Sequence, residues 1–320
     1  MNNILIIGAG QLGSRHLQGA LFSKHELNIT VVDPSQESLN IARERASQVK
    51  YGNSNSVVSY AIDIPENESV DICIIATAAN VRAMVTKQLL LTNEVKQIIF
   101  EKVLFQKLAE YAEVAQLLSD RQSVGWVNCP RRLFPTYIAL KQHLDQSKPT
   151  HMEVRGGAWG MACNSIHFID IFSYLVGDSS LELTETKLDR ELDESKRVGF
   201  YETTGELSFS AGRNSLVVQS SRTENSELMV SIENGQVKAI VNETGGIWTL
   251  SIGGDQHQFK HVALLQSQLT GNYIDDLLIS NQCRLTPFEQ SCELHIPFIK
   301  ALSSHMSAVL NKKLDVCPIT

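Results

Sequence analysis

Three glycines near the N-terminus have a spacing that suits a phosphate-containing ligand. Gly8, Gly10 and Gly13 follow the apolar run Ile4–Ile7 and precede a helical pattern. In the spacing G-x-G-x-x-G, the first glycine permits a tight turn and the second lets a pyrophosphate approach backbone N–H groups. The third lets the helix pack closely on the strand, and the helix N-terminus faces the anion. The residues that we expect to bind a dinucleotide here are Gly8, Gly10, Gln11, Leu12 and Gly13.

An acidic residue follows the second apolar run. Ile29–Val32 ends at Asp33, 20 residues after Gly13. A carboxylate at this point accepts hydrogen bonds from the ribose 2′ and 3′ hydroxyls and repels a 2′-phosphate. The order of strand, glycines, helix, strand and acid therefore predicts NAD as the cofactor and disfavours NADP. The alternative is a glycine-rich turn in another α/β protein, in which Asp33 is a coincidence.

Further polar side chains follow the other apolar runs of the N-terminal part. Lys102 comes shortly after Ile98–Phe100, so its ammonium should emerge beside the nicotinamide. A lysine there can donate to a substrate hydroxyl and stabilise negative charge on its oxygen. The alternative is a surface lysine paired with Glu101. The cofactor-binding residues expected at these strand ends are Thr77, Asn80, Glu101 and Lys102.

A predicted helical segment, residues 163–177, carries a second group of polar side chains. Most of its residues are apolar, while Asn164, His167, Asp170 and Tyr174 fall on one stripe. Histidine exchanges protons near neutral pH, and Asp170 one turn on can orient it. The alternative is a core histidine satisfied by local hydrogen bonds. We expect Asn164, His167 and Asp170 to act in catalysis together with Lys102.

Two arginines just past the last predicted strand of the N-terminal part are candidates for substrate binding. Arg131 or Arg132 can hold a carboxylate or phosphate, although each can equally be a solvated surface charge. The complete set of residues expected to contact the substrate is Lys102, Arg131, Arg132, Asn164 and His167.

The elements that must position these residues alternate between strand and helix over residues 1–129. Strands are expected at 4–7, 29–32, 57–62, 70–76, 98–100 and 124–127, with helices between most of them. Alternation of this kind gives a parallel sheet with helices on both faces. We therefore predict an α/β fold in which residues 1–129 form a doubly wound, dinucleotide-binding Rossmann domain.

Residues 130–320 have a different pattern. Period-two alternation with turn signals such as Asn234-Gly235 runs from 181 to 252, which predicts a mainly antiparallel sheet of five or six strands. Helices are expected at 135–144, 165–175, 263–279 and 287–309. This α+β part should bind the substrate and mediate oligomerisation. A partner subunit is a natural cover for the free face of the sheet, so we expect a homodimer or homotetramer.

Composition narrows the classes of partner. The chain has 320 residues, 43% of them hydrophobic, and a net charge of −7, which argues against nucleic acid or an anionic membrane. The six cysteines include no C-x-x-C pair, so neither a metal site nor a disulfide framework is expected. No apolar stretch is long enough to span a bilayer, and the N-terminus lacks a basic region and a cleavage site. We expect a cytoplasmic protein with a small-molecule substrate.

These residues together give a resemblance to a known family. The chain resembles, essentially end to end, the glucose–fructose oxidoreductase / inositol dehydrogenase / MocA (Gfo/Idh/MocA) family of two-domain NAD(P)-dependent oxidoreductases. The segments that carry the resemblance are GAGQLGSRH at 8–16, IAT at 75–77, EK at 101–102, R-x-x-P at 132–135 and HFID at 167–170. The resemblance implies that Lys102 and His167 serve the hydride-transfer site, with Asp170 as the last aspartate of the D-x-G-x-H-x-x-D motif.

The chain also departs from the family pattern. Val103 stands where the family has proline, and the stretch 78–82 lacks the proline and histidine that commonly follow I-A-T. Cys163 and Ser165 replace the aspartate and glycine ahead of His167, so the usual upstream carboxylate is missing. Asn164 is the nearest substitute and supplies a hydrogen bond but no charge.

The expected function is NAD-dependent hydride transfer to or from a secondary alcohol of a sugar or sugar derivative, including nucleotide-linked and acidic sugars. His167 would be the general base, and Lys102 would hold the substrate oxygen. Two alternatives remain open. One is a non-catalytic, NAD-binding regulatory protein of the same fold, and the other is a dehydrogenase for a non-sugar substrate.

Overall fold

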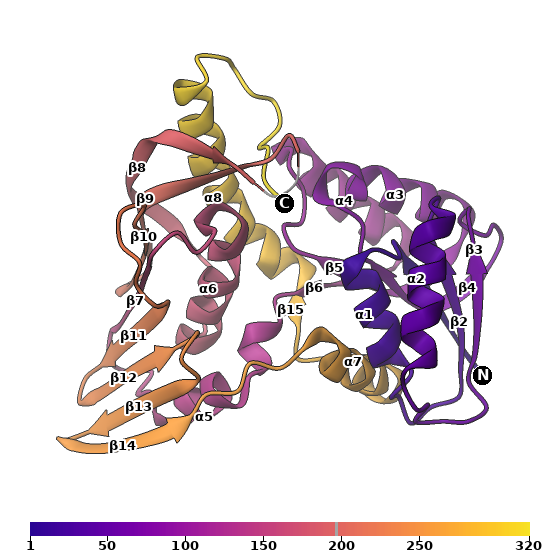
Figure 1. The fold of residues 1–320 in the computed structure, drawn as a ribbon, viewed down its shortest axis with the longest axis horizontal. Helices are drawn as coiled ribbons and strands as arrows, with labels where there is room; N and C mark the ends of the chain where they lie inside the picture. The colour runs from indigo at the N-terminus through magenta and orange to yellow at the C-terminus, as the bar shows by residue number, and fades with distance from the viewer. Residues whose placement is uncertain (196–197) are drawn as a thin grey trace. The chain divides into compact units, whose positions relative to one another are not determined.

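The computed structural model describes residues 1–195 and 198–320, which form two compact units (Figure 1). Unit 1 comprises Met1–Phe105, Ala109–Pro130 and Leu264–Glu289, and unit 2 comprises Gln106–Leu108, Arg131–Ala263 and Gln290–Thr320. Unit 1 thus contains most of the segment predicted as the dinucleotide-binding domain. It also contains a later segment, residues 264–289, that the sequence pattern assigned to the second domain.

Unit 1 is built on a seven-stranded sheet in the order β15-β6-β5-β4-β1-β2-β3. The six strands that come first in the chain pair in parallel. The apolar runs of β1, β2, β4, β5 and β6 are buried because helices cover both faces, whereas the edge strand β3 stays partly exposed. The short β15 adds an antiparallel edge to β6. The strands are β1 Asn2–Ile7, β2 Leu27–Val32, β3 Val57–Ala61, β4 Ser69–Ile75, β5 Glu94–Glu101, β6 Val124–Asn128 and β15 Thr286–Pro287.

The helices of unit 1 follow the doubly wound pattern. Right-handed connections place α1 and α2 on one face of the sheet and α3 and α4 on the other (Figure 1). The predicted Rossmann architecture is therefore confirmed. A fifth helix, α7, packs against α1 so closely that a Cβ on Gly19 would lie 2.7 Å from the Cβ of Thr270. The helices are α1 Gln11–Ala20, α2 Gln36–Ser47, α3 Ala79–Thr92, α4 Leu108–Arg121 and α7 Gln266–Ser280.

Unit 2 contains an eight-stranded sheet in the order β14-β13-β12-β11-β7-β10-β9-β8. All neighbouring strands are antiparallel except β7 and β10, which are parallel. The mainly antiparallel sheet is as predicted. Six of its strands, β8 to β13, lie in the described part of residues 181–252, where five or six were expected, and β7 and β14 lie outside that range. The strands are β7 Thr150–Gly156, β8 Glu182–Glu194, β9 Tyr201–Ala211, β10 Asn214–Ser220, β11 Met229–Asn234, β12 Val237–Asn242, β13 Ile247–Ile252 and β14 Asp255–Lys260.

One face of this sheet is covered by α6, which packs on β7, β9 and β10. The helix is apolar on nearly all sides and is almost completely buried. It begins at Met161, four residues before the predicted start. The remaining helical segments around unit 2 are η1 Pro130–Leu133, α5 Pro135–His143, α6 Met161–Val176 and α8 Phe288–Val309. In the described ranges 1–195 and 198–320, none of the helices has both the length and the apolar character needed to cross a bilayer.

Candidate active site

The glycine-rich loop between β1 and α1 has the shape that its sequence predicts. Gly8 has a φ of +99°, and a Cβ there would lie 3.0 Å from the backbone of Ala76 and Thr77. A Cβ on Gly13 would lie 1.6 Å from the carbonyl oxygen of Gly8, so a side chain at Gly13 is excluded. A Cβ on Gly10 would meet nothing within 4 Å. The loop is therefore packed against β4 on one side and open at Gly10, where the backbone can receive a diphosphate.

The first turn of α1 points its N–H groups at this open side. The helix begins after Gly10, whose carbonyl accepts from the Ser14 N–H at 3.0 Å. The N–H groups of Gln11, Leu12 and Gly13 precede that bond and have no partner within a helix. They combine with the positive end of the helix dipole to favour an anion.

Asp33 lies beside the same loop. Its Oδ2 accepts the Ala9 N–H at 2.7 Å, and its Oδ1 accepts the Ser35 N–H at 2.9 Å. The carboxylate thus holds the loop and the start of α2 in register with β2. A carboxylate has about four acceptor positions, so lone pairs remain for two ribose hydroxyls. The expected convergence of the glycines with Asp33 is present in the structure.

Arg45 is a residue of this region that sequence reasoning missed. Its guanidinium donates to Gln11 Oε1 at 2.7 Å and to Ser14 Oγ at 2.6 Å, so it ties α2 to the first turn of α1. No local motif identifies Arg45, because an arginine near the end of a surface helix is common.

Polar groups that a cofactor can use also lie at the carboxyl ends of β4 and β6. Thr77 Oγ1 and Asn128 Oδ1 are buried, and neither has a hydrogen-bond partner among the described residues. Buried polar atoms without partners are rare in folded proteins. Asn80, in contrast, is exposed at the start of α3. The open glycine loop, Asp33 and these two side-chain oxygens together fit a dinucleotide with a carboxamide-bearing ring.

Glu101, at the end of β5, is the centre of a buried hydrogen-bond network. His16 Nε2 lies 2.8 Å from Glu101 Oε1, and Asn128 Nδ2 donates to the same oxygen at 2.6 Å. Thr270 of α7 lies 3.0 Å from the other ring nitrogen of His16. Burial alone would raise the pKa of Glu101, but His16, the hydrogen bond from Asn128 and the charge of Arg82 together outweigh it, and the pKa is lowered. Glu101, predicted as a cofactor contact, is thus anchored within unit 1.

Lys102 follows Glu101 at the same edge of the sheet and is half-buried. The Lys102–Val103 peptide bond is cis, although residue 103 is not proline. On α3, the helix that precedes β5, the buried Arg82 donates hydrogen bonds to the carbonyls of Val103 and Leu104 and to that of Thr77. The sequence placed Arg82 only within the stretch 78–82, which lacks the proline and histidine of the family, and gave it no role of its own.

In unit 2, α6 carries Asn164, His167 and Asp170 as predicted. His167 is 7% exposed, and Asn164 Nδ2 donates to the Trp159 carbonyl at 3.1 Å. Glu202 of β9 accepts the N–H groups of Ala162 and Cys163 at 2.8 and 3.2 Å. This carboxylate caps the first turn of α6, which explains why the helix begins earlier than its periodicity suggested. Glu202 also brings a negative charge to the helix end at which Cys163 lacks one.

Both candidate arginines form ion pairs inside unit 2. Arg132 Nε and Nη2 donate to the two carboxylate oxygens of Asp170 at 2.7 and 2.9 Å, and both side chains are buried. Arg131 Nε donates to Glu243 at 3.1 Å while its guanidinium lies 5.0 Å from the centre of the Phe168 ring. The Arg131 side chain is 22% exposed. The sequence named the two arginines but gave no sign of these partners.

His261 belongs to the cluster around Glu243. Its Nδ1 lies 2.9 Å from Thr136 Oγ1, and its buried Nε2 lies 3.6 Å from Glu243 Oε1. Burial lowers the pKa of His261, with a further decrease from Arg131, while Glu243 acts in the opposite direction.

The lowered pKa of His261 predicts a loss of stability in acid. Because the folded pKa lies below the unfolded value of 6.5, the unfolded chain binds more protons. Stability should be complete above about pH 6.5 and decline as the pH falls through the window below it. Urea unfolding of wild type and His261→Gln between about pH 5 and 7.5 tests this. The variant should lose part of that slope, and an identical slope in both proteins would disprove the assignment.

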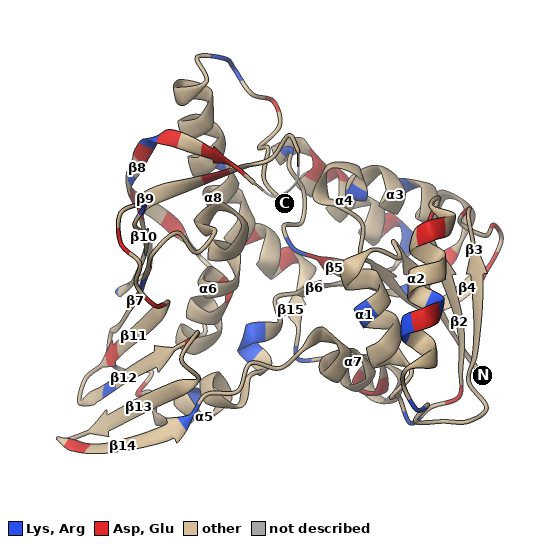
Figure 2. Cartoon of the chain, viewed as in Figure 1, with Lys and Arg blue, Asp and Glu red and all other residues tan. Residues whose placement is uncertain are grey.

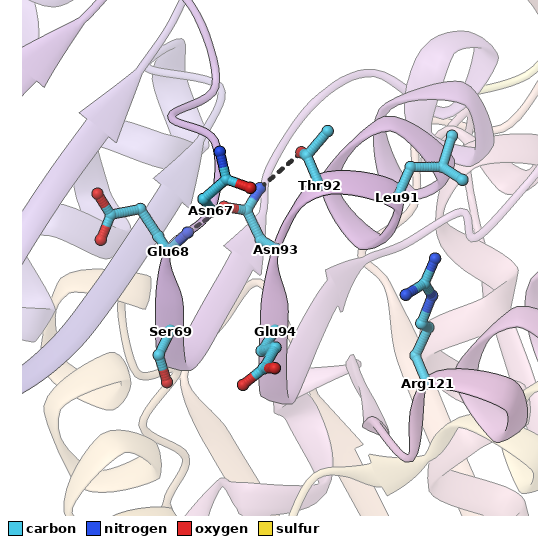
Figure 3. Close-up of a pocket in the computed structure, with 8 residues that line it drawn as sticks. All are labelled: Asn67, Glu68, Ser69, Leu91, Thr92, Asn93, Glu94 and Arg121. Carbon is cyan, nitrogen blue, oxygen red and sulfur yellow. Dashed lines mark hydrogen bonds between the residues drawn. The ribbon is translucent and has the colours of Figure 1, made fainter.

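A separate pocket of about 360 Å³ lies at the opposite edge of the unit 1 sheet (Figure 3). Its lining comes from the amino ends of β4 and β5 and from the helices next to them, and the side chains are Asn67, Glu68, Ser69, Leu91, Thr92, Asn93, Glu94 and Arg121. The buried Asn93 bonds to the Glu68 N–H and to Thr92 Oγ1, both at 2.9 Å. Because ligands of open parallel sheets bind at the carboxyl ends, we do not assign this pocket to the site. Across residues 1–195 and 198–320, no group of three or more His, Cys, Asp or Glu side chains is arranged for a metal ion.

Comparison with known proteins agrees with this geometry. Residues 2–129 match the family model described as "Oxidoreductase family, NAD-binding Rossmann fold" and designated GFO_IDH_MocA. The sequence matches none of the curated proteins with which it was compared.

Several solved structures share the fold of the whole chain at low sequence identity. An oxidoreductase from Agrobacterium radiobacter, solved with NAD+, L-tartaric acid and magnesium, has a TM-score of 0.70 and 14% identity, and covers 96% of this chain and 97% of its own. The UDP-N-acetylglucosamine 3-dehydrogenase from Acidithiobacillus ferrooxidans has a TM-score of 0.66 at 13% identity, with coverage of 94% and 96%. A 3-ketoreductase from Actinomadura kijaniata, solved with TDP-benzene and NADP, has a TM-score of 0.68 at 12% identity, with the same coverage.

The family match and the structural matches cover different lengths of the chain. The range matched by the family model, residues 2–129, includes the glycine loop, Asp33 and Lys102. The structural matches extend over the second sheet, where they show the fold alone. Residues 2–129 therefore belong to the Gfo/Idh/MocA family of NAD(P)-dependent, Rossmann-fold oxidoreductases, and the chain as a whole has the fold of solved members of that family.

Proposed function

We propose that the protein is an NAD-dependent oxidoreductase that acts on a secondary alcohol of a sugar or sugar derivative, including nucleotide-linked and acidic sugars. The observation that carries the proposal is Lys102 at the carboxyl end of β5, at the sheet edge that also holds the open glycine loop. When bound, the nicotinamide of the cofactor supplies the acceptor or donor for the hydride. The names of the similar structures, a nucleotide-sugar dehydrogenase and a 3-ketoreductase, support the substrate class.

Side chains of the protein stabilise the reacting oxygen, transfer its proton and hold α6 in position. Lys102 donates a hydrogen bond to the reacting oxygen and stabilises negative charge there. His167 takes the hydroxyl proton as general base, and Asn164, fixed by the Trp159 carbonyl, supplies a polar group on the preceding turn. Asp170 acts with Arg132 to hold α6 in place.

Of the two candidate arginines, Arg131 is the better substrate contact. Its side chain keeps partial exposure, whereas the fork of Arg132 is occupied by both oxygens of Asp170. Glu243 neutralises part of the Arg131 charge, so Arg131 would orient a polar substrate group rather than bind a free anion strongly.

A substrate screen tests the proposed reaction. Sugars, sugar acids, UDP-sugars, tartrate and amino acids would each be incubated with NAD+ or NADP+, and the reduced nicotinamide followed by absorbance. Turnover of a sugar derivative with NAD+ is expected. Turnover of amino acids alone would contradict the substrate class, and tight NADH binding without turnover of any compound would favour a non-catalytic, NAD-binding protein instead.

The preference for NAD depends on Asp33. Replacing it with alanine removes the acceptor of the Ala9 N–H and the expected ribose contact, so the affinity for NADH should fall about tenfold or more. The same change should weaken discrimination against NADPH, because the charge that repels a 2′-phosphate is gone. Fluorescence titrations with both nucleotides measure this. Glu37→Gln, which alters an exposed acid in the first turn of α2, is the matched control. Equal affinities in wild type and Asp33→Ala would rule out the assigned role.

We also propose that the open face of the unit 2 sheet mediates a homodimer or homotetramer. Charged residues of both signs lie along β7, β11 and β12 (Figure 2). Arg155, Glu233 and Lys238 among them are exposed. Lys238 of β12 pairs with Glu233 of the neighbouring β11 at 3.0 Å, and Ile240, two residues further along β12, is exposed. A surface with both charges can complement a second copy of itself about a two-fold axis. Light scattering of wild type and Ile240→Arg tests the idea, which a monomeric wild type at micromolar concentration would disprove.

A further inference from the structure

Arg82 is the largest charged side chain that is nearly inaccessible in unit 1. It lies in the first turns of α3 and is only 2% exposed. Arginine is almost never buried to this extent unless it is paired, because removing its charge from water is costly. Burial of the Arg82 guanidinium costs free energy, and its hydrogen bonds indicate what offsets that cost.

The guanidinium connects the chain segments that follow two neighbouring strands. Nη1 donates to the carbonyl of Val103 and, at 2.8 Å, to that of Leu104, just after β5. Nη2 donates to the carbonyl of Thr77, just after β4. Arg82 thus fixes the backbone on the C-terminal side of Lys102 to the same loop against which Gly8 packs.

The other side of Lys102 is fixed independently. Glu101 is held by His16 and Asn128 at 2.8 and 2.6 Å. Lys102 is therefore the residue between two anchored points, one made by the Glu101 side chain and one by Arg82 through the carbonyls of Val103 and Leu104. Its side chain, in contrast, remains half-exposed at the sheet edge.

The sequence supplies a reason for such an anchor. A proline at position 103 would restrict the backbone through its fixed φ, but this chain has Val103. A planar guanidinium with several donors in a rigid fork can hold several carbonyls at once, which a lysine ammonium does less well. We propose that Arg82 is a positioning residue for Lys102, an inference that rests on the proposed function of Lys102 at the reacting oxygen.

Substitutions of Arg82 test this proposal together with a matched control on the same helix. Arg82→Lys keeps the charge but loses the fork, and Arg82→Gln loses both. Lys87→Gln removes a partly exposed cation of α3 that pairs with Glu113 at the surface. The first readout is the rate at which a trace of acetic anhydride labels Lys102, relative to the exposed Lys24, measured by peptide mass spectrometry. The second is kcat, KM and the Kd for NADH with the best substrate of the screen.

The expected results separate positioning from mere filling of the core. Both Arg82 variants should change the Lys102-to-Lys24 labelling ratio severalfold and lower kcat about 100-fold, because small displacements of a catalytic group are costly. The Kd for NADH and both readouts of Lys87→Gln should stay close to wild type. A purely structural Arg82 would lower the stability of the variants and leave the labelling ratio and the kcat of the folded protein unchanged.

One outcome overturns the proposal about Arg82, and another shows whether it is the proposed function that fails instead. If Arg82→Lys and Arg82→Gln both bind NADH and retain the wild-type labelling ratio and kcat, Arg82 does not position Lys102. If Arg82→Gln does not fold, Arg82→Lys decides on the same criteria. If wild type turns over no compound, the proposed function fails, while the labelling ratio still decides whether Arg82 places Lys102.

Discussion

Replacing Lys102 with methionine is expected to lower kcat by about 100- to 1,000-fold and to leave the Kd for NADH nearly unchanged. The physical reason is that methionine matches the length of the lysine side chain but has no donor for the charge that develops on the reacting oxygen. Methionine also leaves Glu101 and the Arg82 contacts in place, because both involve other groups. Steady-state kinetics with the best substrate of the screen, together with NADH fluorescence titration, measures the two quantities.

Lys107→Met is the control for this experiment, since Lys107 is exposed five residues further along the same segment. It should change neither kcat nor the Kd for NADH. A Lys102→Met enzyme with the wild-type kcat would remove Lys102 from the mechanism. A large loss of NADH affinity in that variant would instead make Lys102 a cofactor contact and not a group for the transition state.

Asp170→Ala should have the largest effect on stability, with a loss of about 3–5 kcal/mol in the free energy of unfolding. Removing the carboxylate leaves the buried Arg132 guanidinium without the two acceptors that it has at 2.7 and 2.9 Å. An uncompensated buried charge is much less favourable than an apolar pair of similar volume. The double variant Arg132→Met/Asp170→Leu should therefore recover most of the lost stability. Urea unfolding of each protein gives the values.

A surface pair in the same unit provides the comparison. Asp193 lies 2.7 Å from Arg222, and both side chains are partly exposed. Asp193→Ala should cost less than about 1 kcal/mol, because exposed ion pairs contribute little. If Asp170→Ala were no more destabilising than Asp193→Ala, the buried pair would not be what holds α6 in place.

The sequence predicted the parallel sheet of unit 1 well, because its signals are local. Continuous apolar runs such as Ile4–Ile7 identify strands buried on both faces, and the glycine spacing identifies the first turn. The full extent of the unit 2 sheet was not predictable in the same way, because β14 lies beyond residues 181–252, where the strands were expected. The edge strands β8 and β14 are exposed along almost their whole length, so they lack the alternation that marks a half-buried strand. Only pairing with β9 and β13 makes them strands.

The candidate site was predictable in its residue types but not in its hydrogen bonds. Asp33, Lys102 and His167 were found from their positions relative to apolar runs. The partners that fix them were not found, because Glu202 and Arg82 act on backbone groups that are distant in sequence. The Arg132–Asp170 pair has the same origin, since its members are 38 positions apart in the sequence. Such choices depend on which elements the finished fold places side by side.

The return of residues 264–289 to unit 1 has a practical consequence for dissecting this protein. A fragment cut at residue 129, where the family match ends, would lack α7 and the Thr270 partner of His16. It would also lack Phe288, against which Gly125 packs so tightly that a Cβ would come within 2.7 Å. The shortest piece of chain that contains every part of the nucleotide-binding unit therefore extends to residue 289, and a fragment that ends at residue 129 would have an incomplete core.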